Sequence, residues 1–204
     1  SRTSLMIGII VALWEAVAGI IIGAAWGYVK WLDRPLTEIY NVLNNIPNTI
    51  IMILMTYILR PSMSTMIISI CLTSWIGMAR FVRNLTIIIR DREYNLASKC
   101  LGTPTWKIVT KNLLPYLVSV IVLSTALSIA STIGYEVFLT YIGLGLPVSI
   151  PSLGNLIDEG RTLMMIPSQR YQLIFPSIIV SIITISFYIM GNVFADSADP
   201  KNHV

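Results

Sequence analysis

Residues 5–29 read LMIGIIVALWEAVAGIIIGAAWGYV, and Glu15 is the single charged side chain among them. An α-helix needs about 20 consecutive apolar residues to cross the hydrocarbon core of a bilayer. The stretch is too long for the apolar region of a secretory signal peptide, and further apolar runs follow it. We therefore predict a membrane-spanning helix here and a chain that crosses the membrane several times.

Composition supports a membrane protein. Hydrophobic residues make up 55% of the 204 residues and charged residues 12%, whereas soluble domains carry about 25% charged residues. A lipid-facing surface needs no charge, which explains the deficit. Cys71 and Cys100 lack the spacing of a zinc site or a disulfide scaffold, so neither is expected.

Five spanning segments are predicted, at about residues 5–29, 39–59, 63–82, 113–142 and 173–195, which gives an all-α helix bundle. The second is the weakest, because polar residues occupy one face of its first half. That face carries Thr37, Glu38, Asn41, Asn44, Asn45 and Asn48. Pro47 removes a backbone donor and predicts a kink. Such a polar face inside a membrane must contact protein, water or the interface.

The distribution of Lys and Arg predicts the orientation, since cytoplasmic loops carry the excess. One set of connections holds ten of these residues: Lys30, Arg34, Arg80, Arg83, Arg90, Arg92, Lys99, Lys107, Lys111 and Lys201. The other set holds four: Arg2, Arg60, Arg161 and Arg170. We expect the first set in the cytoplasm, the amino terminus outside and the carboxyl terminus inside. The net charge of +4 then reflects topology, and no nucleic-acid partner is expected.

Residues 91–115 read DREYNLASKCLGTPTWKIVTKNLLP, which predicts two short helices meeting at a sharp bend. Gly102 has the character of a residue that ends a helix in the left-handed conformation. Thr103 suits an N-cap and Pro104 the first helical position. From these residues alone, a solvated connector is favoured. A DNA-binding helix-turn-helix is disfavoured, because both ends run into membrane.

The same loop resembles the EAA loop of binding-protein-dependent ABC importer permeases. The family pattern is Glu-Ala-Ala, three residues, Gly, nine residues, Ile, one residue and Leu-Pro. This chain matches it at Ala97, Gly102, Leu114 and Pro115. It departs at three positions, with Leu96 for the Glu, Ser98 for the second Ala and Asn112 for the Ile.

Further motifs resemble the oligopeptide and dipeptide permeases and extend the resemblance over essentially the whole chain. They are Thr73-Ser74-Trp75, Ala79-Arg80 with Val82-Arg83, Glu93-Tyr94, Glu136, Tyr141 to Gly145, Pro151 to Asn155, Gly191, Asp196 and Asp199-Pro200. The chain is similar to the C-type permease subunit of a peptide importer. That family has one more helix ahead of residue 1, so we expect the sequence to lack its first helix.

The resemblance implies the type I ABC importer permease fold and a division of labour. Residues 1–195 would form the transmembrane domain, with a cytoplasmic coupling loop at about 83–112, an external loop at about 142–172 and a tail at 196–204. The implied partners are a second homologous permease, cytoplasmic P-loop ATPases that bind ATP and Mg²⁺, and an external solute-binding protein in a bacterial cell membrane. Peptides are the family's commonest cargo, although nickel and other small solutes use similar permeases. Coupling to the ATPase would involve Leu96, Ala97, Ser98, Gly102, Leu114 and Pro115.

Polar residues inside the spans have two interpretations. Glu136 either lines the pathway and meets cargo, or makes a structural hydrogen bond or lies at the interface. For Glu15 the structural interpretation is stronger. Asn44, Asn45 and Asn48 either line a peptide pathway or join helices by hydrogen bonds.

Other functions are less compatible with the sequence. An intramembrane protease would need a Ser–His pair, paired Asp residues or zinc ligands, and the lone His203 is penultimate. No GxxxxGK[ST] motif is present, so the chain has no P-loop of its own and is not expected to be an enzyme. An ion-coupled secondary transporter or channel subunit is the main alternative, but it has no need of the cytoplasmic loop. A membrane anchor would not need polar groups at depth.

Overall fold

The computed structural model describes residues 2–198, and every regular element in that range is a helix. The α-helices are α1 (Arg2–Tyr28), α2 (Lys30–Asn44), α3 (Asn48–Leu59), α4 (Met63–Arg90), α5 (Glu93–Cys100), α6 (Thr105–Ile108), α7 (Leu114–Tyr141), α8 (Leu153–Thr162) and α9 (Tyr171–Ala198). A π-helical segment, η1 (Val109–Leu113), joins α6 to α7, and a 3₁₀ turn, η2 (Pro167–Gln169), precedes α9. The all-α bundle predicted from the sequence is confirmed. Predicted features at Asp199, Pro200, Lys201 and His203 lie outside the described residues.

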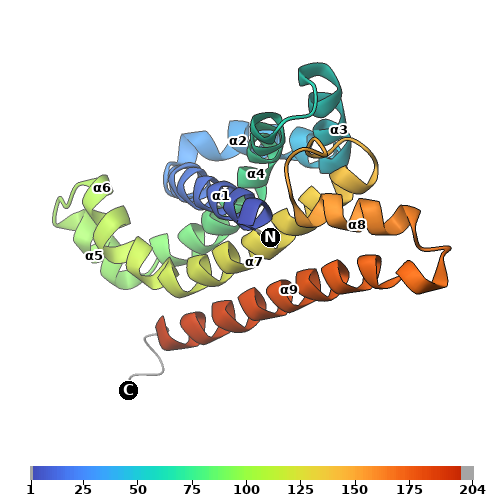
Figure 1. Ribbon diagram of the computed structural model, residues 1–204. Helices are drawn as coiled ribbons and strands as arrows, with labels where there is room; N and C mark the ends of the chain where they lie inside the picture. The colour runs from blue at the N-terminus through green and yellow to red at the C-terminus, as the bar shows by residue number, and fades with distance from the viewer. Residues whose placement is uncertain (1, 199–204) are drawn as a thin grey trace.

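Among the described residues, four helices are each long and apolar enough to cross a bilayer: α1, α4, α7 and α9. The bent pair α2 and α3 meets the same criteria when it is taken as one span. Figure 1 shows α9 running beside α7, with α5 and α6 at one end of the bundle and α8 at the other. At the α5 end, Arg90 donates to the carbonyl of Gly27 at 2.8 Å. At the α8 end, Thr3 donates to the carbonyl of Pro151 at 2.8 Å. Because α1 and α4 both end at the α5 end, they run in the same direction, and the chain returns between them through α2 and α3.

The second predicted span differs from expectation. Instead of one kinked helix over 39–59, α2 begins at Lys30, α3 ends at Leu59, and the two are bent by 74°. Pro47 has an extended ψ of 123° and precedes α3 as its N-cap, so the helix stops and restarts. Because proline has no backbone N–H, Pro47 cannot donate the hydrogen bond that would continue the helical pattern from α2 into α3.

Helix α4 continues to Arg90, beyond residue 82, where the third span was predicted to end. Two arginines made that end look like a loop, but both lie within the helix. Arg80 lies over the Tyr40 ring, with its guanidinium carbon 4.5 Å from the ring centroid. Arg83 pairs with Asp33 of α2, with Nε and Nη2 at 2.9 and 2.5 Å from Oδ1. The aromatic ring beside Arg80 and the carboxylate beside Arg83 compensate the two charges, so both arginines can lie within a long apolar helix.

Close packing of α1 against α4 depends on a glycine stripe at every fourth residue: Gly19, Gly23 and Gly27. A Cβ atom at Gly23 would lie 2.4 Å from the carbonyl oxygen of Ala79. At Gly27 it would lie 2.7 Å from the carbonyl oxygen of Arg83. Small residues at this spacing let two membrane helices approach until their backbones touch, which increases dispersion contact where lipid provides no hydrophobic driving force.

Helix α9 covers the outside of the bundle. Its residues are mostly exposed, including Phe175, Ile182 and Phe194. On its inner side, Gly191 packs against Ala126 of α7, and a Cβ there would lie 2.9 Å from that side chain. A helix this apolar on its outer surface suits contact with lipid chains.

Candidate functional site: a polar cavity and an exposed helical loop

A cavity of about 350 Å³ lies among α1, α2, α3, α4 and α7. Most of its lining side chains carry a hydroxyl, amide or carboxyl group, although the surrounding helices are apolar. Those polar residues are Glu15, Asn44, Asn48, Thr73, Ser74, Ser124, Ser128, Ser131, Thr132 and Tyr135. A polar hollow bounded by spanning helices can hold water or a polar solute at membrane depth.

The bend between α2 and α3 brings two of the three predicted asparagines to this cavity. Asn44 is the last residue of α2 and Asn48 the first of α3, so both flank the break at Pro47. Asn45 does not line the cavity, and its amide donates to the carbonyl of Asn41 at 2.6 Å.

Glu15 supplies the only charged side chain among the described residues that line the cavity. It lies half-buried on α1, and the Ser128 hydroxyl of α7 donates a hydrogen bond to its Oε2. The Ser74 hydroxyl, also on the cavity wall, is buried and has no hydrogen-bond partner. The residues around the cavity therefore include one carboxylate, that of Glu15. They also include one hydroxyl, that of Ser74, that has no hydrogen-bond partner in the protein.

Glu136 lies elsewhere and belongs to a fixed network between helices. Its side chain is fully buried and does not line the cavity. The Ser4 hydroxyl donates to Glu136 Oε2 at 2.9 Å, and the Leu153 N–H donates to the Ser4 oxygen at 3.1 Å. Gly154 packs so closely that a Cβ there would lie 2.7 Å from Oε1. This geometry matches the structural interpretation of Glu136, because the carboxylate ties α1, α7 and the start of α8 together.

The loop from α5 to η1 has the predicted form of two helices meeting at a bend. Gly102 has φ +79°. Its N–H donates to the carbonyl of Lys99, and the Thr103 N–H donates to that of Ser98, at 3.0 and 3.1 Å. These two bonds form a Schellman motif with Gly102 as the left-handed residue. The predicted N-cap is off by one residue, because Pro104 is the N-cap and α6 begins at Thr105.

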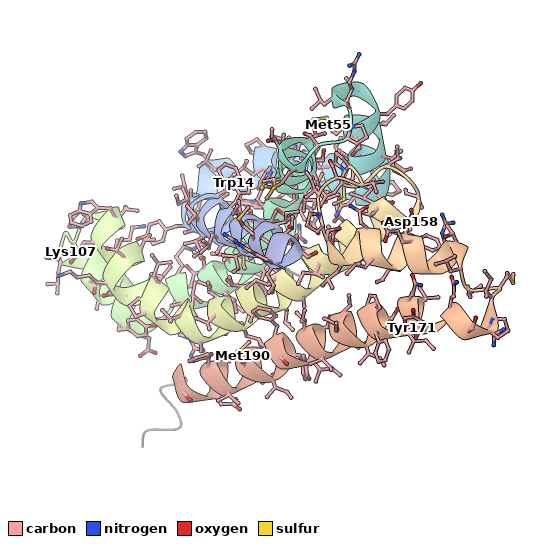
Figure 2. The ribbon with its side chains drawn as sticks, in the orientation of Figure 1. Trp14, Met55, Lys107, Asp158, Tyr171 and Met190 are labelled. Atoms are coloured by element: carbon pink, nitrogen blue, oxygen red, sulfur yellow. The ribbon has the colours of Figure 1, made fainter. Side chains whose placement is uncertain are left out.

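The two short helices present apolar side chains to solvent. Leu101 is 85% exposed, Trp106 67% and Leu96 48%. Ala97 is also exposed, and Figure 2 shows Lys107 at this far end of the molecule. Large apolar groups gathered on an exposed, non-spanning segment are typical of a surface that another protein covers.

Two amides fasten this loop to the spanning helices. Asn95 of α5 is buried, and its Nδ2 donates to the carbonyl of Ile89 in α4 at 2.9 Å. Asn112 of η1 donates to Asn95 Oδ1 at 3.1 Å and lies 3.5 Å from the Ser98 hydroxyl. The chain continues into α7 through Leu114 and Pro115, with Pro115 in the first turn. Sequence reasoning missed Asn95, since an isolated asparagine in a polar loop gives no signal.

The connection from 142 to 172 is rich in turns and contains α8. Gly143 has φ +80° and ends α7. The Ser152 hydroxyl caps α8 by accepting from the Asn155 N–H at 3.1 Å, and the Asn155 side chain donates to the carbonyls of Pro147 and Ile150. Val148, by contrast, is 77% exposed at the tip of the turn.

Comparison with known proteins now decides the family. Residues 16–204 match the model of the family described as binding-protein-dependent transport system inner membrane component. The chain belongs to this family. It is therefore a membrane component, in agreement with its long apolar helices.

Three curated relatives of the chain are named as peptide permeases. The chain is 40% identical over 203 residues to the oligopeptide transport system permease protein AmiD of Streptococcus pneumoniae, covering 100% of the chain and 65% of the relative. It is 36% identical to the dipeptide transport system permease protein DppC of Lactococcus lactis, covering 97% and 58%. For DppC of Bacillus subtilis the identity is 33%, covering 98% and 63%. The chain thus spans less than two thirds of the length of these relatives.

Solved structures support the fold of this family member. A chain from inward-facing conformations of the MetNI methionine ABC transporter matches with a TM-score of 0.78 and 18% identity, over 97% of this chain and 93% of that one. A second crystal form of the same transporter gives a TM-score of 0.77. At this identity the match establishes the arrangement of helices alone, which this chain shares with that chain of the transporter.

Proposed function

We propose that this chain is the membrane-spanning permease subunit of an ATP-driven importer and that it forms part of the pathway for peptides delivered by an external binding protein. The observation that carries the proposal is the exposed apolar loop of α5 and α6, fastened by Asn95 and Asn112 to the helices that surround a polar cavity. A solvated connector has no use for exposed Leu101 and Trp106. The peptide names of the curated relatives support the cargo class.

The proposed orientation places α5 and α6 in the cytoplasm and the amino-terminal end of α1 outside. The excess of Lys and Arg at the α5 end supports this arrangement. In the structure, Lys30, Arg90 and Lys99 surround one polar hollow at that end, and the Arg90 guanidinium beside Asp91 lowers the pKa of that carboxyl. The bacterial cell membrane is the proposed location.

In the proposed assembly, the exposed face of α5 docks on a P-loop ATPase that binds ATP and Mg²⁺. Leu96, Ala97 and Ser98 would meet the ATPase, and Gly102 would let its surface approach the backbone. Leu114 and Pro115 would pass the movement into α7, because η1 and α7 are continuous. An ATPase pair that closes on ATP would then move α5, η1 and α7 as one lever.

The cavity is the proposed section of the pathway contributed by this chain, and a second homologous permease would complete it. Asn44 and Asn48 would offer donors and acceptors to peptide backbone groups without selecting charge. Asn45 and Glu136 do not line this cavity and are not part of the proposed pathway section. The α8 end would receive the solute-binding protein.

Reconstitution tests this function. The chain would be coexpressed with its candidate ATPases and second permease, purified as a complex and placed in liposomes with the binding protein and a labelled peptide. We expect uptake that requires ATP and the binding protein. Uptake driven by an ion gradient without ATP would instead support a secondary transporter.

A further inference from the structure

Glu15 occupies the middle of the membrane-spanning part of the fold. Helix α1 runs from Arg2 to Tyr28, so Glu15 lies roughly 20 Å from either end at a rise of about 1.5 Å per residue. A carboxylate at that depth is unfavourable unless a cation, water or hydrogen-bond donors compensate it, and intramembrane carboxylates commonly mark solute pathways. Its location therefore calls for a physical explanation.

The protein gives Glu15 little compensation. None of the described residues around the cavity is Lys, Arg or His. The Ser128 hydroxyl is its hydrogen-bond donor. Glu136 of α7 is fully buried, and its carboxylate accepts hydrogen bonds from Ser4 of α1 and from Thr140 of its own helix. The two carboxylates therefore differ in kind: Glu136 is part of the framework, whereas Glu15 faces open space.

The other polar groups of the cavity wall are uncharged. Ser124, Ser128 and Ser131 follow one face of α7, and Asn48 lies on α3. Ser74 of α4 is among the lining residues, and its buried hydroxyl has no hydrogen-bond partner. A volume of about 350 Å³ falls within the range of small-ligand pockets, roughly 300–1,000 Å³. These groups could accept hydrogen bonds around a small cationic head.

We propose that Glu15 and the surrounding hydroxyls form a site for a protonated primary amine, which for a peptide is its amino-terminal ammonium. An ammonium has three donors and no acceptor, so one donor meets the Glu15 carboxylate and the others meet neutral oxygens. The cargo supplies the missing cation while it passes the middle of the membrane. Because Glu15 is only half-buried, the contact is weak enough to release cargo, as passage through a pore requires. This inference rests on the proposed peptide function.

The experiment compares two peptides that differ only at their amino terminus. Uptake of a neutral tripeptide with a free amine and of its N-acetylated form is measured in the reconstituted complex, with saturating binding protein. Glu15→Gln should lower uptake of the free-amine peptide roughly tenfold, the size of a lost charged hydrogen bond, and leave the acetylated peptide unchanged. Glu15→Asp, which keeps the charge, should retain the preference for the free amine. Glu38→Gln, an exposed carboxylate of α2 away from the cavity, is the control and should change neither.

A second measurement needs no variant and remains available if Glu15→Gln assembles poorly. In the wild-type complex, n-butylammonium should slow uptake of the free-amine peptide, and n-butanol at the same concentration should not. Equal effects of these two compounds, or equal loss of both peptides in a well-assembled Glu15→Gln complex, would overturn the amine site while leaving peptide import intact. A wild-type complex that assembles and imports neither peptide would instead overturn the proposed function, and the amine site with it.

Discussion

Substitution of Gly102 tests whether the α5–α6 loop is a docking surface. Gly102 has φ +79°, and no heavy atom lies within 4 Å of the position that its Cβ would take. A residue with a Cβ in the left-handed conformation costs roughly 1–2 kcal/mol. In the chain alone, Gly102→Asp should therefore add only this strain, with no clash and no effect on the membrane-spanning helices. We expect normal insertion and abundance.

A much larger effect is expected once the ATPase covers the loop. Taking a carboxylate out of water without a partner has a penalty of several kcal/mol, on the order of a hundredfold or more in affinity. Gly102→Asn has nearly the same shape, tolerates the left-handed conformation and carries no charge. The difference between the Asp and Asn variants therefore isolates the charge contribution. Gly102→Asp should lose the ATPase, and Gly102→Asn should retain a substantial part of it.

The assay measures copurification of the ATPase and ATP-dependent uptake at matched membrane abundance. Gly143→Asp is the matched control, since Gly143 has φ +80° and equally open surroundings at the opposite end of the bundle. It should keep the ATPase. Ala97→Glu should act like Gly102→Asp through charge and size, whereas Lys107→Ala on α6 should be milder. Wild-type ATPase retention in Gly102→Asp, or equal loss in Gly143→Asp, would refute the docking argument.

Three other measurements follow from the structure. If α5 lies in the cytoplasm, the exposed Cys100 should react with an impermeant thiol reagent only from that side. Cys71, which lies within α4, should stay protected. Labelling of Cys100 from outside intact cells would reverse the topology. Val148→Asp should abolish stimulation of the ATPase by the binding protein without disturbing assembly, because Val148 is exposed at the α8 end. Unchanged stimulation would mean that this turn does not receive the binding protein. Gly23→Ala should lower the free energy of unfolding by about 1–3 kcal/mol through overpacking, because the new Cβ would lie 2.4 Å from a backbone oxygen. The measurement is the melting temperature, which should fall. Gly77→Ala is the control and should melt normally, since the space around Gly77 is open.

The sequence by itself determined the class of protein, most of its spans and the bend in its loop. Long apolar runs are sufficient for a spanning helix because lipid offers no partner to backbone groups, so the helix must satisfy them within its own segment. The conformation of Gly102 was predictable for a similar reason. A helix-ending glycine depends on its own backbone and its immediate neighbours. The glycine stripe on α1 is also recognisable in the sequence from its spacing of four residues.

Only the tertiary structure decided how the polar groups are used. Glu15 and Glu136 are each a single carboxylate in an apolar stretch, and the sequence favoured a structural role more strongly for Glu15 than for Glu136. Which of them faces the cavity depends on how α1 and α7 are rotated, and contacts distant in sequence fix that rotation, including Gly23 against Ala79 and Ser4 against Glu136. Likewise, Pro47 predicts a kink but not a break of 74°, because the angle depends on what packs on either side. Local pattern specifies where a helix runs, whereas packing between helices specifies which of its faces meets lipid, protein or the cavity.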